Sequence, residues 1–297
     1  MSPLSAFTND GQTDIAMASS VHLRPFRPGD LEAAQRLSSE LRWPHRLEDW
    51  QSALVHGAGI VAECDGRLVG TALRWLWGND RASVGLVLVS PALQRQRIGR
   101  RLMAALLADI GRRHVLVHAA EPGQLLCEKL GFRRAGQVCR HEGFARQAAS
   151  PALAHGERLR PLAREDVETL VALDMKAAGL PRGPVVRRLL SDEQVVVFDR
   201  DGRPAGYSVL RRFGGGLAIG PVVAPDVASA RALIGYWCRL HQGKFLRIDV
   251  DAESGMPPWL EHLGLKQAGN STAMVRGKLP PRGPACGGWA LIGQGMG

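Results

Sequence analysis

The feature that most constrains this chain is an internal duplication, because a repeated sequence pattern predicts a repeated structural unit. Leu23-Arg24-Pro25 is followed by an acidic helix start, and Leu159-Arg160-Pro161 is followed by another, at an offset of 136 residues. The turn sequence Asp65-Gly66-Arg67 recurs as Asp201-Gly202-Arg203 at the same offset. Near the end of each half, residues 128–136 match residues 261–269 at an offset of 133. Three matches in one order predict two copies of one domain.

The domain boundaries follow from composition between and outside the copies. Residues 146–157 contain Ser150, Pro151 and Gly156 without hydrophobic periodicity, which is typical of a linker. The C-terminal residues could be disordered or could add a strand to a sheet. We expect a flexible N-terminal tail at 1–20, a first domain at 21–146, a linker at 147–156, a second domain at 157–279 and a C-terminal tail at 280–297.

Each half has the pattern of a mixed α/β sheet, with antiparallel strands first and a strand–helix–strand unit later. The Asp-Gly turn between two strand-like runs predicts a hairpin. The long helix places Leu102, Met103, Leu106, Leu107 and Ile110 on one face. In the first half we expect helices near 30–41, 46–55, 98–113 and 124–130, and strands near 59–64, 68–75, 82–89, 115–118 and 132–140.

Charge and cysteine usage exclude several classes of protein. The net charge is +10, but each half carries 19 basic and 14 acidic residues, without a long basic tract. Nucleic-acid binding is therefore not favoured. Five scattered cysteines show no spacing for a metal site. With no signal-peptide pattern and no long apolar run, we expect a soluble cytoplasmic protein without a membrane partner; the oligomeric state stays open.

An unusual arginine cluster lies at the start of the long helix. Arg95, Arg97, Arg100 and Arg101 fall within seven residues. A helix N-terminus is electropositive, so cations are disfavoured there unless an anion binds. The cluster therefore indicates a phosphate-bearing ligand, and a solvated basic loop is the alternative.

Two motifs resemble the GNAT acetyltransferase superfamily. They are Gln94-x-x-Arg97-x-Gly99 after a strand, and Leu126-Cys127-Glu128-Lys129-Leu130-Gly131-Phe132 in the later helix. The resemblance covers about 21–145 strongly and 157–278 more weakly, and implies tandem GNAT acyl-CoA N-acyltransferase folds. It also implies an N-acetyltransferase that uses acetyl-CoA (CoA) as co-substrate, needs no metal, and acetylates the primary amine of a small molecule.

The family pattern implies which residues hold the coenzyme. Val87 N–H would lie near the acetyl carbonyl, where it would stabilise the developing oxyanion, and Val89 would lie along the pantetheine arm. The implied coenzyme-binding residues are Val87, Leu88, Val89, Gln94, Arg95, Gln96, Arg97, Ile98, Gly99 and Arg100.

Three residues depart from the family pattern. Arg97 replaces the usual first loop glycine, Cys127 replaces the tyrosine often assigned as the acid, and Ala120 replaces a frequent asparagine. No carboxylate lies on strand 82–89, so Glu121 becomes the first candidate for the base and Cys127 for the acid.

The segment between the first two helices is where the family often shapes its acceptor pocket. Trp43, His45, Glu48 and Asp49 would suit a cationic small amine. The alternative is that Trp50 belongs to the core and the two carboxylates only start a helix. His118 is more readily explained as a packed histidine than as a ligand.

The second copy lacks the loop glycine and most of the arginines, and Asp226 would oppose an anion there. We therefore expect only the first copy to bind the coenzyme. The rival hypothesis is a non-catalytic CoA- or acyl-CoA-binding sensor, favoured by Cys127 and by the missing strand carboxylate. The acceptor could be an amino acid, an amino sugar or a polyamine.

Overall fold

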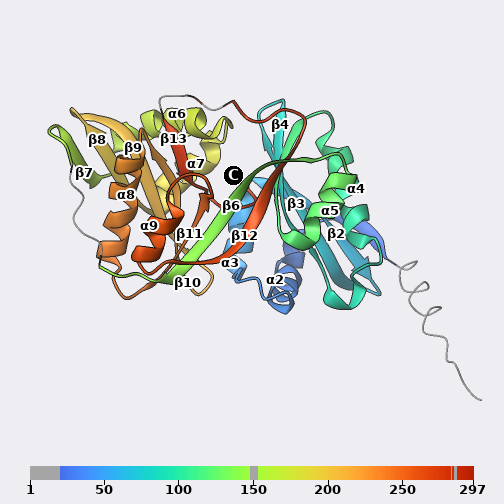
Figure 1. Ribbon diagram of the computed structural model, residues 1–297. Helices are drawn as coiled ribbons and strands as arrows, with labels where there is room; N and C mark the ends of the chain where they lie inside the picture. Colours follow the sequence, from blue (N-terminus) through green and yellow to red (C-terminus); the bar gives the residue numbers. More distant parts are fainter. Residues whose placement is uncertain (1–20, 148–152, 282, 284–285) are drawn as a thin grey trace, which may run out of the picture. The chain divides into compact units, whose positions relative to one another are not determined.

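The computed structural model describes residues 21–147, 153–281, 283 and 286–297. The fold is mixed α/β with a large mixed sheet (Figure 1). The chain divides into two compact units. The first comprises the described residues up to Leu54 with Ala58–Leu73 and Leu86–Asp109, and the second comprises Val55–Gly57, Arg74–Gly85 and the described part of Ile110–Gly297.

The first unit contains the N-terminal elements of the first repeat. Its core includes Trp50, which is fully buried and donates its indole N–H to the Ser38 hydroxyl at 3.1 Å. Gly70 lets a strand approach the long helix, since a Cβ there would lie 3.0 Å from Leu102. The elements are β1 (His22–Pro25), a 3-10 turn (Pro28–Asp30), α2 (Leu31–Glu40), α3 (Leu47–Val55), β2 (Gly57–Cys64), β3 (Arg67–Trp77), β4 (Arg81–Val89), a 3-10 turn (Pro91–Leu93) and α4 (Ile98–Ile110); β3 and β4 each continue into the second unit.

The helix face predicted from the sequence is confirmed. Leu102, Met103, Leu106 and Ile110 of α4 are at most 1% exposed. The helix ends at Ile110 rather than near residue 113, because Gly111 adopts a left-handed conformation (φ 71°).

An ion-pair network repeats with the sequence. In the first unit, Arg24 of β1 donates twice to Asp30, both at 2.8 Å, and once to Glu63 of β2 at 2.7 Å. In the second unit, Arg160 donates to Asp166 at 2.6 and 2.9 Å and to Asp199 at 2.8 Å. All three positions are offset by 136 residues, so the duplication extends to individual contacts. The hydrogen bonds from arginine hold the pKa of Asp30 and Asp166 below its usual value.

The second unit contains the rest of the first repeat and the whole second repeat. Its elements are β5 (His114–Ala119), α5 (Glu121–Lys129), β6 (Arg133–Phe144), β7 (Glu157–Pro161), a 3-10 turn (Arg164–Asp166), α6 (Val167–Ala178), α7 (Gly183–Asp192), β8 (Gln194–Arg200), β9 (Arg203–Phe213), β10 (Gly216–Ala224), α8 (Val227–Leu240), β11 (Phe245–Asp251), α9 (Pro257–His262), β12 (Lys266–Arg276) and β13 (Gly287–Ala290).

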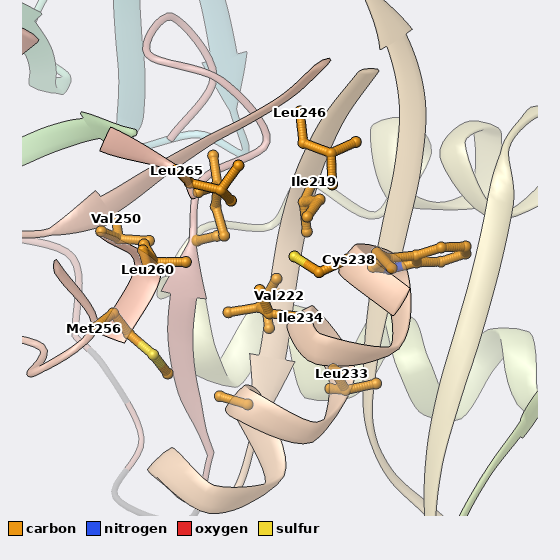
Figure 2. Packing of buried hydrophobic residues seen from close by; sticks show 14 of the residues in the cluster. Ile219, Val222, Leu233, Ile234, Cys238, Leu246, Val250, Met256, Leu260 and Leu265 are labelled. Carbon is orange, nitrogen blue, oxygen red and sulfur yellow. The ribbon is translucent and has the colours of Figure 1, made fainter. Parts of the chain in front are cut away.

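Helices cover both faces of the second-repeat strands, because successive buried residues of a strand pack against helices on opposite faces. On β10, Val222 packs in one cluster with Leu233 and Ile234 of α8 (Figure 2), whereas Val223 packs in another with Leu170 of α6. Strands buried on both faces read as continuous apolar runs. This explains why residues 195–198 and 217–224 do not alternate between apolar and polar side chains.

The last strands of the two repeats are exchanged. Strand β5 of the first repeat pairs with β12 of the second, and β6 of the first repeat pairs with both β12 and β11 (Figure 1). Each repeat therefore completes its part of the sheet with a strand from the other repeat. The sequence pattern predicts that residues 132–140 close their own half, and the pairing of β6 with β11 and β12 shows that this prediction is wrong.

The C-terminal residues form a strand, which is one of the two alternatives left open by the sequence. β13 pairs antiparallel with β10 at Val222–Ala224. All five cysteines are free and buried. Among the described residues, no helix is long and apolar enough to cross a membrane.

Candidate active site

The arginine cluster lies in a loop between β4 and α4 that has an unusual backbone. Arg95 and Arg97 both adopt left-handed conformations, with φ of 67° and 63°. Non-glycine residues rarely do so, and such strain concentrates at functional sites. Arg97 replaces a glycine of the pattern that the sequence resembles, and its left-handed conformation is one that glycine adopts readily. Alternating left-handed residues turn successive N–H groups toward one side, which makes an anion-binding concavity.

The main-chain donors of this loop are unused within the described part of the chain. The first main-chain bond of α4 runs from Arg101 N–H to the Arg97 carbonyl at 3.0 Å. Between Arg95 and Arg100, no N–H donates to a described acceptor. Helix N-termini leave such donors for ligands or water. The loop therefore offers several donors to one anion.

Three of the four arginine side chains are available to that anion. Arg95, Arg97 and Arg100 are exposed and form no ion pair with any described residue. Arg101 is engaged, because it donates to the Val21 carbonyl at 2.7 Å. Buried Ile98, 1% exposed, anchors the start of the helix, and Gln94 donates to the Val89 carbonyl at 3.3 Å.

Strand β4 is also strained next to the implied carbonyl-binding residue. Leu86 has a φ of 50°, and its carbonyl accepts a hydrogen bond from the Thr71 hydroxyl at 2.8 Å. Leu86 and Leu88 are buried, while Val87 and Val89 are half-buried. The register of β5 with β4 covers Arg81–Val84 only. The residues after Leu86 therefore lie beyond the part of β4 that pairs with β5.

The corresponding positions of the second repeat are occupied by the protein itself. Asp226 caps α8 by accepting from the Ser229 N–H at 2.8 Å, and it also contacts Arg200 at 3.1 Å. The Asp226 carboxylate thus already accepts from an N–H group at the helix N-terminus that a bound anion would need. On β10, Val222–Ala224 correspond to residues 86–88 and are covered by β13.

The two residues suggested as acid and base lie on α5. Glu121 is its first residue and is exposed. Cys127 is 5% exposed, and burial raises the pKa of its thiol to about 11. The Cys127 thiol therefore keeps its proton at neutral pH.

We expect Cys127→Ala to lower turnover less than tenfold. An ordinary thiolate leaving group has a pKa of about 8.5, so proton transfer from the Cys127 thiol would be uphill. Turnover in saturating acetyl-CoA tests this, with Cys238→Ala as the control because that thiol is also buried. Complete loss of turnover in Cys127→Ala alone would show that the thiol is an essential acid.

The predicted acceptor residues have varied environments. The rings of Trp43 and His45 are stacked, with centroids 5.7 Å apart. Asp49 accepts from the Arg46 N–H at 2.9 Å and from its guanidinium, so it serves as a local helix cap. Glu48 is exposed. Trp43, His45 and Glu48 therefore retain polar or aromatic surface, whereas Asp49 is engaged in the helix start.

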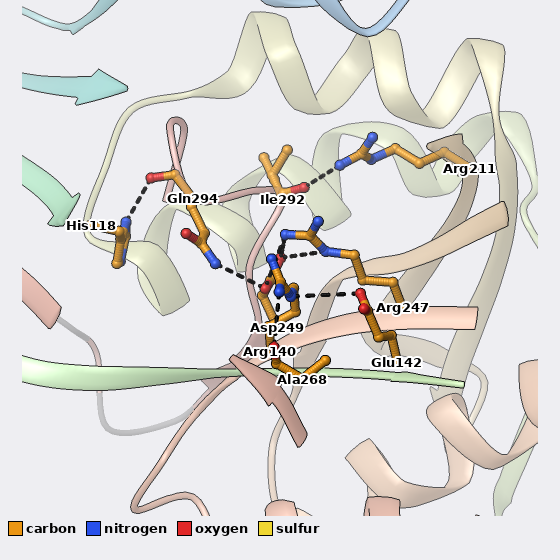
Figure 3. Close-up of polar contacts among 9 residues, drawn as sticks. All are labelled: His118, Arg140, Glu142, Arg211, Arg247, Asp249, Ala268, Ile292 and Gln294. Atoms are coloured by element: carbon orange, nitrogen blue, oxygen red, sulfur yellow. Dashed lines mark hydrogen bonds and ion pairs between the residues drawn. The ribbon is translucent and has the colours of Figure 1, made fainter. Parts of the chain in front are cut away.

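A polar cluster that the sequence did not reveal lies in the second unit (Figure 3). His118 of β5 approaches the Gln294 carbonyl at 2.7 Å, and the Gln294 side chain donates to Asp249 of β11 at 3.1 Å. Asp249 is also bound by Arg247 at 2.9 Å. His118 and Asp249 are 176 and 45 positions away from Gln294 in the sequence, and no local pattern connects them.

Comparisons with known proteins identify the family of both halves of the chain. Residues 56–134 and 170–284 each match a family model described as an acetyltransferase (GNAT) domain. The uncharacterised N-acetyltransferase YitH of Bacillus subtilis (strain 168) is 27% identical over 223 residues, covering 73% of this chain and 78% of YitH.

Solved structures share the fold along most of the chain. A candidate acetyltransferase from Pyrococcus horikoshii matches with a TM-score of 0.76 and 19% identity, covering 94% of this chain and 96% of that one. A tandem GNAT protein from the clavulanic acid biosynthesis pathway matches with a TM-score of 0.65 and 17% identity, covering 86% and 98%.

Proposed function

The chain belongs to the GNAT N-acetyltransferase family and carries two GNAT domains, and on this premise we propose that it acetylates the primary amine of a small molecule. The donor is acetyl-CoA, bound by the first repeat. The observation that carries this proposal is the loop before α4, where Arg95 and Arg97 are left-handed and the N–H groups from Arg95 to Arg100 are unused by described acceptors.

The backbone and the charge of the loop support pyrophosphate binding. Unused N–H groups beside left-handed residues are typical of anion-binding concavities, and three exposed guanidinium groups can add charge-assisted hydrogen bonds. In this proposal the coenzyme is held by residues 87–89 and 94–100. The second repeat is a poor alternative, because Asp226 caps its helix and β13 covers the matching strand.

Acetyl-CoA supplies an activated acetyl thioester, and the chain supplies orientation and proton transfer. The Val87 N–H donates to the oxygen that becomes negatively charged when an amine attacks. Glu121 is the proposed base that takes a proton from the acceptor ammonium. Cys127 keeps its proton at neutral pH, so release of the thiolate relies on its own stability.

The acceptor is proposed to be a cationic amine of modest size. The stacked Trp43 and His45 rings provide an aromatic surface, and the exposed Glu48 provides negative charge. An amino acid, an amino sugar and a polyamine all satisfy this chemistry.

A CoA-binding sensor is the second candidate. The high pKa of the Cys127 thiol favours it, because the position of the family's acid then holds a weak one.

Titration of the full chain with acetyl-CoA, followed by a thiol-release assay across an amine panel, tests both candidates. We expect one acetyl-CoA bound per chain and amine-dependent release of CoA thiol. Binding without release on any amine would favour the sensor, and absence of binding would contradict both.

A further inference from the structure

Strand β4 departs from regular strand geometry at Leu86, immediately before the residue whose amide the proposed reaction uses. Leu86 has a left-handed backbone, with a φ of 50°. A left-handed residue within a strand is typical of a β-bulge, which bends the strand and locally disrupts its hydrogen-bond ladder. For a residue other than glycine this conformation is uncommon, and it persists only where the surrounding structure holds it. The neighbours of Leu86 must therefore stabilise it.

The side chain of Thr71, on β3, provides one such contact. Its hydroxyl donates to the Leu86 carbonyl at 2.8 Å. Thr71 is fully buried and Leu86 is 8% exposed, so the hydrogen bond lies away from water, where it is electrostatically stronger. Threonine is branched at Cβ, which restricts χ1 and keeps the hydroxyl in a defined direction. The Leu86 carbonyl is therefore held by a rigid, buried donor.

The residues next to this hydrogen bond are also held closely, and all of them belong to the first unit. The Ser90 N–H donates to the Val69 carbonyl at 2.8 Å. A Cβ on Gly70 would lie 3.1 Å from the Leu88 carbonyl oxygen, so the two strands approach each other tightly there. Thr71 therefore has a fixed position relative to the end of β4.

The peptide bond that Thr71 holds is the one that carries the Val87 N–H. The Leu86 carbonyl and the Val87 N–H belong to one trans peptide unit, so they point in opposite directions. Fixing the carbonyl therefore fixes the N–H, which points away from Thr71. A hydrogen bond to the carbonyl also polarises the amide, which makes its N–H a better donor.

We propose that Thr71 is a positioning residue for the acetyl transfer, whose hydroxyl holds the Leu86–Val87 peptide so that the Val87 N–H is aimed at the acetyl carbonyl. The inference rests on the proposed function, in which this N–H donates to the developing oxyanion. Thr71 acts through the peptide and does not itself contact the substrate. A donor that is oriented in advance costs no reorganisation when the negative charge develops.

The second repeat uses the matching positions differently. At the offset of 136 residues Thr71 corresponds to Tyr207, whose hydroxyl donates to Asp174 at 2.7 Å. Leu86 corresponds to Val222, which pairs with β13. The threonine contact thus belongs to the repeat that is proposed to bind acetyl-CoA.

Two substitutions at position 71 separate the hydroxyl from the shape of the side chain. Thr71→Val keeps the shape and removes the donor, whereas Thr71→Ser keeps the donor and is the matched control. With saturating acetyl-CoA and the best amine from the panel, we expect kcat to fall about tenfold or more in Thr71→Val and less than about threefold in Thr71→Ser. The dissociation constant for CoA, which has no acetyl carbonyl, should stay within about twofold in both variants.

The infrared band of the acetyl carbonyl provides a readout that a purely structural role would not move. A hydrogen bond from the Val87 N–H weakens the thioester C=O bond and lowers its stretching frequency. With acetyl-CoA isotope-labelled at this carbonyl, we expect a band below that of free acetyl-CoA in the wild type and in Thr71→Ser. In Thr71→Val the band should return toward the free value.

The results that would overturn this inference differ from those that would overturn the enzyme. An active wild type, with unchanged kcat and an unchanged carbonyl band in Thr71→Val, would overturn only the role of Thr71. An equal loss of kcat in both variants, or weakened CoA binding in Thr71→Val, would do the same, because the side chain would then serve the fold. A wild type that acetylates no amine would overturn the proposed function and this inference together.

Discussion

Replacing Arg97 and Arg100 together with glutamate is expected to weaken acetyl-CoA binding at least a hundredfold. Each guanidinium can form a charge-assisted hydrogen bond with phosphate, contributing about 1.5–3 kcal/mol. Loss of two such bonds amounts to a factor of one hundred or more. The measurement is the dissociation constant by isothermal titration.

The same substitutions should leave the fold intact. Both side chains are exposed and form no ion pair with a described residue. Glutamate near a helix N-terminus is favourable, by about 0.3–1 kcal/mol, so the melting temperature of the ligand-free protein should stay equal or rise slightly. Weak binding combined with an unchanged melting temperature would show that the substitutions remove contacts with acetyl-CoA and do not disturb the fold.

Arg112→Glu provides the matched control for charge. Arg112 is exposed beyond the opposite end of α4, and its reversal changes the net charge in the same direction. We expect less than a threefold change in acetyl-CoA affinity. An equal loss per substituted charge at Arg112 would mean that the arginines act only through long-range attraction. Unchanged binding in the double variant would remove the loop from the coenzyme site.

The second large effect is expected from Arg182→Met, which should lower the free energy of unfolding by about 3–5 kcal/mol. Arg182 is 4% exposed and Asp174 is 1% exposed. Their guanidinium–carboxylate contacts are 2.8 and 3.0 Å, and Tyr207 donates to the same carboxylate at 2.7 Å. Removing the arginine leaves a buried carboxylate without its counter-charge. Denaturant unfolding measures the loss.

An exposed pair with similar geometry separates burial from ion pairing. Arg187 contacts Glu168 at 2.7 Å, but the side chains are 47% and 72% exposed. Arg187→Met should leave the denaturation midpoint nearly unchanged, because an exposed ion pair contributes little to stability. The double variant Asp174→Leu with Arg182→Met should be more stable than Arg182→Met alone, since no buried charge remains unpaired. Equal losses in Arg182→Met and Arg187→Met would contradict this account.

Local patterns were sufficient for most of the secondary structure. The apolar spacing of α4 predicted its buried face because helical periodicity is a property of neighbouring residues. The duplication was predicted from short motifs, and the repeated arginine networks around Asp30 and Asp166 confirm it. The left-handed conformation of Arg97 is consistent with its place at the position of a usual glycine.

The acceptor side was less predictable. Asp49 is a residue type expected in a site for a cationic amine, but its carboxylate accepts hydrogen bonds from Arg46, three residues earlier. The sequence favours a packed histidine at position 118, and the contact of His118 with Gln294 joins residues that are distant in sequence. Long-range contacts depend on how strands are ordered, which hydrophobic periodicity does not encode.

The sequence by itself determined that this protein has two copies of one α/β pattern and that one copy has arginines at the start of its long helix. Those properties depend on residues close together in the chain. The tertiary structure decided that β6 and β12 are exchanged between the repeats and that Gln294 and Gly295 contact β5 and β4. Two similar repeats offer each edge strand two comparable partners, so the choice between them is made by packing of the whole sheet.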